Sequence, residues 1–265
     1  MGQAKNKKQR FLAMPENSIC CYCGRPAETI DHFPPRTIYS GRNWPEGYEF
    51  PACNSCNQSK KHDEQSLGLL VRLMRFDIDT DDKEFQEACR AVHNNNKVLF
   101  SELQFHSAVV SKKNLQARFG SARQVSNLGL LGWRTCSCGP ESERLIDNFC
   151  VWFAQTAWFL HSKTVFSGRI IWNNLLVEHL DFEPAQKIIN NLVGYPTMMR
   201  NGKNVSKDFF YKYFSNEDIF VAFFQFGSKP QMIFVVCATR QGVIDINTEI
   251  PDYWGRRDIV LLSDN

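Results

Sequence analysis

Four cysteines near the amino terminus constrain the fold of this chain more than any other feature. Cys20 and Cys23 form one Cys-x-x-Cys pair, and Cys53 and Cys56 form a second. Each pair can present two thiolates to one Zn²⁺, and four thiolates complete a tetrahedral site with no open position. We therefore expect a structural zinc site that leaves any chemistry to other side chains.

An Asp-His dipeptide and an asparagine accompany the two cysteine pairs. Asp31-His32 lies between the pairs, and Asn57 directly follows the last cysteine. With these residues in this order, the segment from about Ile19 to about Lys61 resembles the HNH endonuclease family in its four-cysteine form. Further residues that carry the resemblance are Gly24, Pro34, Arg36, Pro51 and Ala52. The resemblance implies a ββα-metal module in which a β-hairpin carries the histidine.

The resemblance also implies hydrolysis of phosphodiester bonds in DNA, which needs an activated water and an electrophile on the phosphate. An imidazole that titrates near neutral pH suits water activation, so His32 is the candidate general base. Asp31 and the side-chain oxygen of Asn57 suit Mg²⁺ or Mn²⁺ better than Zn²⁺. Because successive strand residues point to opposite faces, we expect Asp31 to bind the metal while His32 reaches the water from the other side.

We expect Asn57 to open a helix, because the surrounding segment Asn-Ser-Cys-Asn-Gln-Ser is rich in capping residues. Lys60 and Lys61 follow three and four residues later and so lie on the same helical face. The partial positive charge of a helix amino terminus favours a phosphate nearby. We predict that Arg36, Lys60 and Lys61 contact the nucleic acid.

The sequence departs from the family at the asparagine that orients the catalytic histidine. That asparagine usually lies five residues before the second cysteine pair, where this chain has Tyr48. Asn43 is nearby but out of register, so either Tyr48 or Asn43 is expected to brace the loop that carries His32. A second departure is Lys61, which stands where some members have a histidine ligand. With Asp31 and Asn57 as the two protein ligands, water and phosphate would complete the coordination shell of the magnesium ion.

A zinc-containing module that binds nucleic acid or scaffolds a complex without cutting it is the alternative function. The endonuclease hypothesis, unlike this alternative, requires Asp31, His32 and Asn57 to converge on an open cavity that can hold a metal. A defence or mobile-element role, with a partner protein or a second copy of the chain, follows only by association with the family.

The composition is that of an ordinary globular protein, with 43% hydrophobic and 22% charged residues among 265. The net charge of +3 is too small to identify a nucleic-acid-binding protein. Residues 1–15 are expected to form a disordered basic arm. We find no secretory signal and no apolar stretch long enough to cross a membrane, so we expect no membrane partner. Ten cysteines without an export signal favour a reducing, cytoplasmic compartment.

We predict an α+β fold in three parts after the arm. A treble-clef-like ββα-metal module spans residues 16–76, a mainly helical connecting region spans 77–140, and an α+β domain with a small antiparallel sheet spans 141–265. Helices are predicted at residues 67–74, 83–94, 141–161 and 182–193, and strands at residues 220–226, 232–237 and 242–246. The aromatic residues of 208–214 are expected in the core rather than stacked on bases.

Overall fold

The computed structural model describes residues 2–39, 41, 43–74, 82–127, 132, 134–176, 190–227, 232–240 and 257–261. Helices and antiparallel strands are mixed, as the predicted α+β class requires. The longer helices are α1 (Gly2–Leu12), α2 (Asn54–Ser59), α3 (Lys61–Met74), α4 (Lys83–Asn95), α5 (Lys97–Glu102), α6 (Ala108–Phe119), α7 (Ala122–Asn127) and α8 (Pro140–Ser162). Two short 3-10 helices are η1 (Pro15–Asn17) and η2 (Arg36–Ile38).

The strands form one larger sheet and three pairs. The larger sheet has the order β11-β5-β10-β9-β8, and the pairs are β1-β2, β3-β4 and β6-β7. The strands are β1 (Thr29–His32), β2 (Glu49–Ala52), β3 (Gln104–Phe105), β4 (Cys136–Ser137), β5 (Gly168–Leu176), β6 (Met199–Arg200), β7 (Lys203–Asn204), β8 (Phe209–Ser215), β9 (Ile219–Phe226), β10 (Met232–Thr239) and β11 (Arg257–Leu261).

The amino-terminal part is an antiparallel strand pair followed by two consecutive helices. In the pair β1-β2, His32 lies opposite Glu49. Helix α2 begins at Asn54 rather than at Asn57, because the sulfur of Cys53 accepts the backbone N–H of Cys56 at 3.4 Å and so caps the helix. The expectation that Asn57 opens the helix was therefore wrong.

The five-stranded sheet contains the strands predicted at residues 220–226 and 232–237, which are parts of β9 and β10. Strand β8 buries Phe209 and Tyr211 completely, which confirms the expected core placement for these two, whereas Phe210 and Tyr213 are partly buried and Phe214 is 40% exposed. The strand β5, which we did not predict, lies inside this sheet, between β11 and β10. Most of the predicted helix at residues 182–193 lies outside the described residues. The predicted strand at 242–246 lies entirely outside them.

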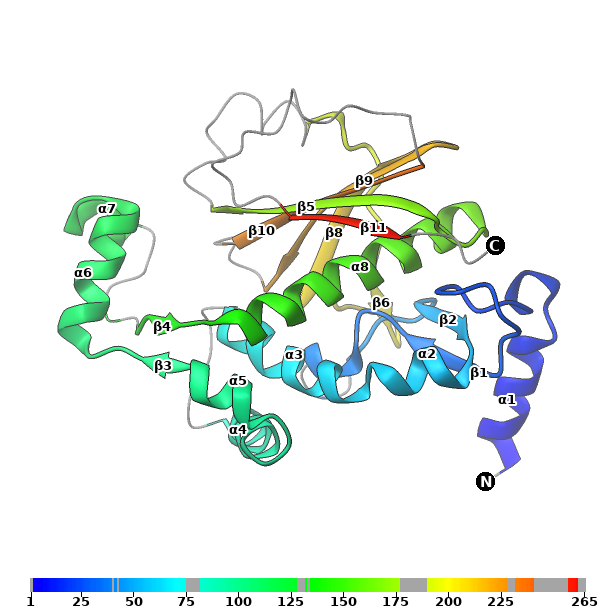
Figure 1. Ribbon diagram of the computed structural model, residues 1–265, viewed down its shortest axis with the longest axis horizontal. Helices are drawn as coiled ribbons and strands as arrows, with labels where there is room; N and C mark the ends of the chain where they lie inside the picture. Colours follow the sequence, from blue (N-terminus) through cyan, green and yellow to red (C-terminus); the bar gives the residue numbers. More distant parts are fainter. Residues whose placement is uncertain are drawn as a thin grey trace.

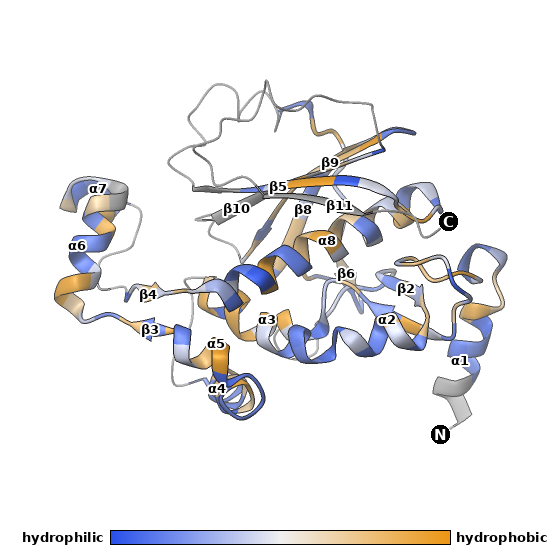
Figure 2. Cartoon of the chain, in the orientation of Figure 1, coloured by the Kyte–Doolittle hydropathy of each residue, from blue (hydrophilic) through white to orange (hydrophobic). Residues whose placement is uncertain are grey.

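Helix α8 lies between the five-stranded sheet and the layer that contains α2 and α3 (Figure 1). Its Phe153 contacts Phe224 of the sheet, with ring centres 4.7 Å apart. Phe149 packs at 5.0 Å against Phe33, which directly follows β1. Hydrophobic and hydrophilic stretches alternate along the helix (Figure 2). One hydrophobic core cluster therefore includes residues of the amino-terminal part, α8 and the sheet.

Side-chain caps fix where the middle helices begin. Asp82 accepts the backbone N–H of Glu84 at 3.2 Å and caps α4, as the sequence predicts for the helix at residues 83–94. Glu102 accepts the backbone N–H groups of Glu141 and Ser142 at 3.0–3.2 Å, so a carboxylate caps the start of α8. Helices α6 and α7 extend away from the layers of the molecule (Figure 1).

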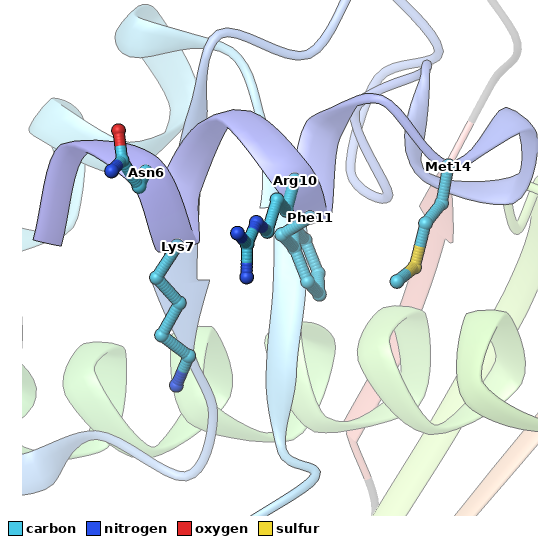
Figure 3. Close-up of a pocket in the computed structure, with 5 residues that line it drawn as sticks. All are labelled: Asn6, Lys7, Arg10, Phe11 and Met14. Atoms are coloured by element: carbon cyan, nitrogen blue, oxygen red, sulfur yellow. The ribbon is translucent and has the colours of Figure 1, made fainter. Parts of the chain in front are cut away.

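Residues 2–12 form helix α1 where we expected a disordered arm. The side chain of Asn17 donates to the carbonyl of Phe11 at 3.0 Å, and Lys7 pairs with Glu49 of β2 at 2.5 Å. Lys7, Arg10 and Phe11 project from the same side of the helix, where they line a shallow hollow of about 430 Å³ (Figure 3). These tertiary contacts stabilise a helix that the polar sequence of this segment alone does not predict.

Candidate functional site

The four paired cysteines lie together at the base of β1 and β2. Their sulfur atoms all lie within 4.8 Å of one another, and those of Cys23 and Cys53 are 3.7 Å apart. Four sulfurs at about 2.3 Å from a central Zn²⁺ would be separated by about 3.8 Å in a tetrahedron. The cluster can therefore hold a metal such as zinc, with Cys20, Cys23, Cys53 and Cys56 as the ligands.

Hydrogen bonds support the thiolate form of one ligand. Burial alone would raise the pKa of Cys23, but hydrogen bonding by Arg25 and by neighbouring cysteines lowers this pKa to about 7. Nε of Arg25 donates to this sulfur at 3.3 Å. Burial raises the pKa of Cys20 and of Cys56, so these thiols need a cation beside them to ionise.

The carboxylate of Asp31 lies in a buried ion pair. Oδ2 accepts the hydroxyl of Tyr22 at 2.5 Å and pairs with Nζ of Lys60, and both charged side chains are at most 5% exposed. Oδ1 accepts the backbone N–H of His32 at 2.8 Å. The ammonium of Lys60 also lies over the ring of Tyr22, at 4.1 Å from its centre. Both carboxylate oxygens of Asp31 are thus already engaged by donors of the chain.

This pairing corrects the expected role of Lys60. We predicted that Lys60 contacts the nucleic acid, but the residue is 2% exposed and its charge is directed into the protein. The break between α2 and α3 explains the difference, because Lys60 lies between the two helices and turns toward β1. Lys61, the first residue of α3, is exposed and remains available to a ligand.

His32 points to the other face of β1, as strand alternation predicts. The imidazole is half-buried, and its Nε2 contacts Nη2 of Arg36. Burial first, and then the charge of Arg36, lower the pKa of His32 to about 4, although Glu49 opposes this shift. At neutral pH the imidazole is therefore uncharged and able to accept a proton.

An arginine and a tryptophan contact this histidine, and a second arginine lies over the tryptophan. The guanidinium of Arg36 lies 4.2 Å from the ring centre of Trp44, and that of Arg200 lies 4.5 Å from it. The ring of Trp44 meets that of His32 edge-on, with centres 6.4 Å apart. Trp44 and Arg200 were missed by sequence reasoning, because neither belongs to a motif and Arg200 lies far along the chain.

Asn57 and Asp31 lie on the same side of β1, but their side chains bind different groups of the chain. Nδ2 of Asn57 donates to the hydroxyl of Thr29 at 3.3 Å, and Thr29 lies two residues before Asp31. His32 lies on the opposite face. The structure thus brings the three predicted catalytic residues onto two neighbouring elements, β1 and α2, with Asp31 and His32 on opposite faces of β1.

The two candidate braces lie in different surroundings. The backbone carbonyl of Tyr48 accepts the N–H of Phe33 at 3.2 Å, so Tyr48 supports the chain after His32 through its backbone. Its side chain is buried, which raises its pKa to about 12, and faces Tyr211 rather than the histidine. Asn43 is exposed.

Comparison of the chain with known protein families, with curated proteins and with solved structures finds no match. The resemblance to HNH endonucleases thus rests on the residues between Ile19 and Lys61 alone. None of the described helices is both long enough and apolar enough to span a membrane.

Proposed function

We propose that this chain is an endonuclease of the HNH type that hydrolyses phosphodiester bonds in DNA. The observation that carries the proposal is the neighbourhood of His32, a neutral imidazole in contact with the guanidinium of Arg36, which shares the ring of Trp44 with Arg200. A general base next to a guanidinium that can bind the phosphate is a combination that suits hydrolysis of a phosphodiester. The four-cysteine cluster supports the proposal because it joins the start of β1 to the end of β2 and so fixes the strand pair whose other end carries the histidine.

In this proposal His32 takes a proton from the attacking water. Arg36 donates to Nε2 of the free histidine, so this nitrogen becomes available when a phosphate takes over the guanidinium. Because the pKa of His32 is lowered to about 4, the base stays unprotonated from neutral pH down to about pH 4. Protonation of His32 in the free protein should therefore lower kcat/KM only near the bottom of that range.

A catalytic Mg²⁺ or Mn²⁺ does not fit the residues as they are arranged. Asp31 and Asn57 have suitable oxygen atoms, and Asn57 donates to Thr29 through Nδ2 and not through its oxygen, but Lys60 already neutralises the carboxylate of Asp31. A divalent metal at Asp31 requires the ammonium of Lys60 to leave first. We therefore assign no step of the reaction to the metal.

A plasmid-nicking assay tests the proposal. Wild-type protein is incubated with supercoiled DNA and added Mg²⁺ or Mn²⁺, and the metal is omitted rather than chelated in the control so that the cysteine site is undisturbed. His32→Ala should retain its fold but lose cleavage, typically by 10²-fold or more. Equal rates for His32→Ala and wild type would show that His32 is not the base.

The alternative, a module that binds nucleic acid without cutting it, is favoured by one observation. The buried pair of Asp31 and Lys60 leaves no free carboxylate oxygen at the position where a nuclease metal is expected. Wild-type protein that binds DNA but never cuts it with any divalent metal would make this alternative the better description.

A further inference from the structure

Two arginines that are distant in the sequence lie over one tryptophan. Arg36 belongs to η2, and Arg200 belongs to β6. Both guanidiniums lie within 4.5 Å of the ring centre of Trp44. The cation–π contacts therefore hold both guanidiniums close to one ring.

No carboxylate of the described residues lies within ion-pair distance of these two cations, although the charges of Glu49, Asp31 and Glu64 act on Arg36 from farther away. Within the part of the chain that the structure describes, neither Arg36 nor Arg200 forms an ion pair, whereas Arg72 nearby is paired with Asp82 and Glu84. Burial and then the charge of Arg200 lower the pKa of Arg36, so the two guanidiniums are close enough to repel each other. An anion that binds between them would relieve this repulsion.

Backbone contacts hold Arg200 in position. The backbone N–H of Glu46 donates to the carbonyl of Met199 at 2.8 Å, and the carboxylate of Glu46 accepts the N–H of Asn201 at 3.3 Å. Arg200 lies between these two anchored residues, and Trp44 lies two residues before Glu46. The site is thus built before any ligand arrives, which lowers the entropy cost of binding.

The surroundings of the pair favour an extended ligand. Arg36 and Trp44 are among the residues that line an open groove of about 640 Å³, together with residues of α3 and α4. Arg36 also contacts His32, so an anion bound by Arg36 would lie next to the imidazole. A strand of nucleic acid offers repeated phosphates and base faces, and guanidiniums and tryptophan bind both kinds of group.

We infer that Arg36, Trp44 and Arg200 form one platform that binds the phosphodiester backbone of a DNA strand beside His32. The carboxy-terminal half of the chain thereby contributes to substrate binding through the β6-β7 hairpin. The inference rests on the nucleic-acid substrate of the proposed function, but not on cleavage of that substrate.

Binding of a short fluorescein-labelled DNA duplex, followed by fluorescence anisotropy across a range of salt concentrations, tests the platform. No divalent metal and no chelator are added, so that DNA stays intact and the cysteine site is undisturbed. Arg200→Gln should weaken binding about ten-fold and reduce the slope of log K against log salt by about 0.9, the value for one phosphate contact. Lys203→Gln, an exposed position on the same hairpin, is the matched control and should leave the slope unchanged.

Each outcome separates the platform from the nuclease proposal. If Arg200→Gln and Lys203→Gln bind DNA alike, the platform is wrong even when the wild type cuts DNA. If the wild type never cuts but its binding depends on Arg200, the platform stands and the hydrolysis proposal fails. Thermal unfolding of every variant is recorded, and Arg36→Gln, which changes a different element, provides the same test if Arg200→Gln does not fold. Wild-type protein that binds no DNA would overturn both.

Discussion

At the scale of single residues, the pair of Lys60 and Asp31 determines what the candidate site can do. Both side chains are at most 5% exposed, so neither charge can be compensated by water. Removal of one partner from a buried pair leaves the other charge uncompensated and typically costs 3–5 kcal/mol. The hydroxyl of Tyr22 and the backbone N–H of His32 would remain as neutral donors to the carboxylate of Asp31.

Lys60→Met should therefore lower the free energy of unfolding by about 3–5 kcal/mol. Denaturation by urea measures this loss, and Lys61→Met is the control, because Lys61 is the next residue but is exposed. The double variant Lys60→Met with Asp31→Asn should recover most of the loss, since it removes both charges. Equal stability of Lys60→Met and Lys61→Met would contradict the buried pair.

Residue types and spacing predicted the cysteine cluster but not this pair. The cysteines could be assigned because two ligands at a fixed short spacing imply a common metal, and the strand period correctly placed Asp31 and His32 on opposite faces. The direction of Lys60 depends on the break between α2 and α3, which no local motif marks. The contact between Trp44 and Arg200 depends on how a distant hairpin docks, so sequence reasoning could not find it.

At the scale of secondary-structure elements, the close approach of η2 to α3 positions Arg36. Gly68 of α3 faces Thr37 of η2, and a Cβ atom added to Gly68 would lie 2.7 Å from the Cβ of Thr37. The hydroxyl of Thr37 donates to the carbonyl of Glu64 at 2.6 Å and holds the two elements together. Only a glycine at position 68 allows this distance.

Gly68→Ala should destabilise the protein by about 1–3 kcal/mol through overpacking, even though alanine favours a helix by up to about 1 kcal/mol. Differential scanning calorimetry should record a melting temperature lower by about 2–4 °C for each kcal/mol lost. Lys61→Ala, at an exposed position of the same helix, should change the melting temperature little. A Gly68→Ala variant that is more stable than wild type would show that η2 does not lie against α3.

Elements with strong apolar patterns were the ones that sequence reasoning found. The helix predicted at residues 141–161 corresponds to α8, whose buried residues recur at helical spacing, and β9 and β10 have long apolar runs. Strand β5 was missed because Asn173 and Asn174 interrupt its apolar residues. Helix α1 was missed because its order comes from the contact of Lys7 with Glu49 of β2 and from the bond that Asn17 donates to the carbonyl of Phe11.

At the scale of the whole molecule, the cysteine cluster and the carboxy-terminal sheet stabilise the same core. Cys20 and Cys53 belong to the hydrophobic cluster that also contains α8 and the sheet. The side chain of Gln155 in α8 donates to the carbonyl of Tyr22, which lies between the first two cysteines, at 3.2 Å. Loss of a metal from the cluster should therefore affect the entire core rather than the amino-terminal part alone.

Cys53→Ala should lose the bound metal and unfold at a much lower temperature than wild type, because a structural zinc can contribute on the order of 10 kcal/mol. Elemental analysis of the purified protein should find zinc in the wild type and none in the variant. Far-UV circular dichroism and tryptophan fluorescence should report one common unfolding transition.

Cys21→Ala is the matched control, since Cys21 is fully buried beside Cys20 but lies outside the four-cysteine cluster. It should keep its zinc and lose only the stability that a small buried side chain provides. Wild-type protein without zinc, or a Cys53→Ala variant no less stable than Cys21→Ala, would mean that the four sulfurs do not hold a structural metal.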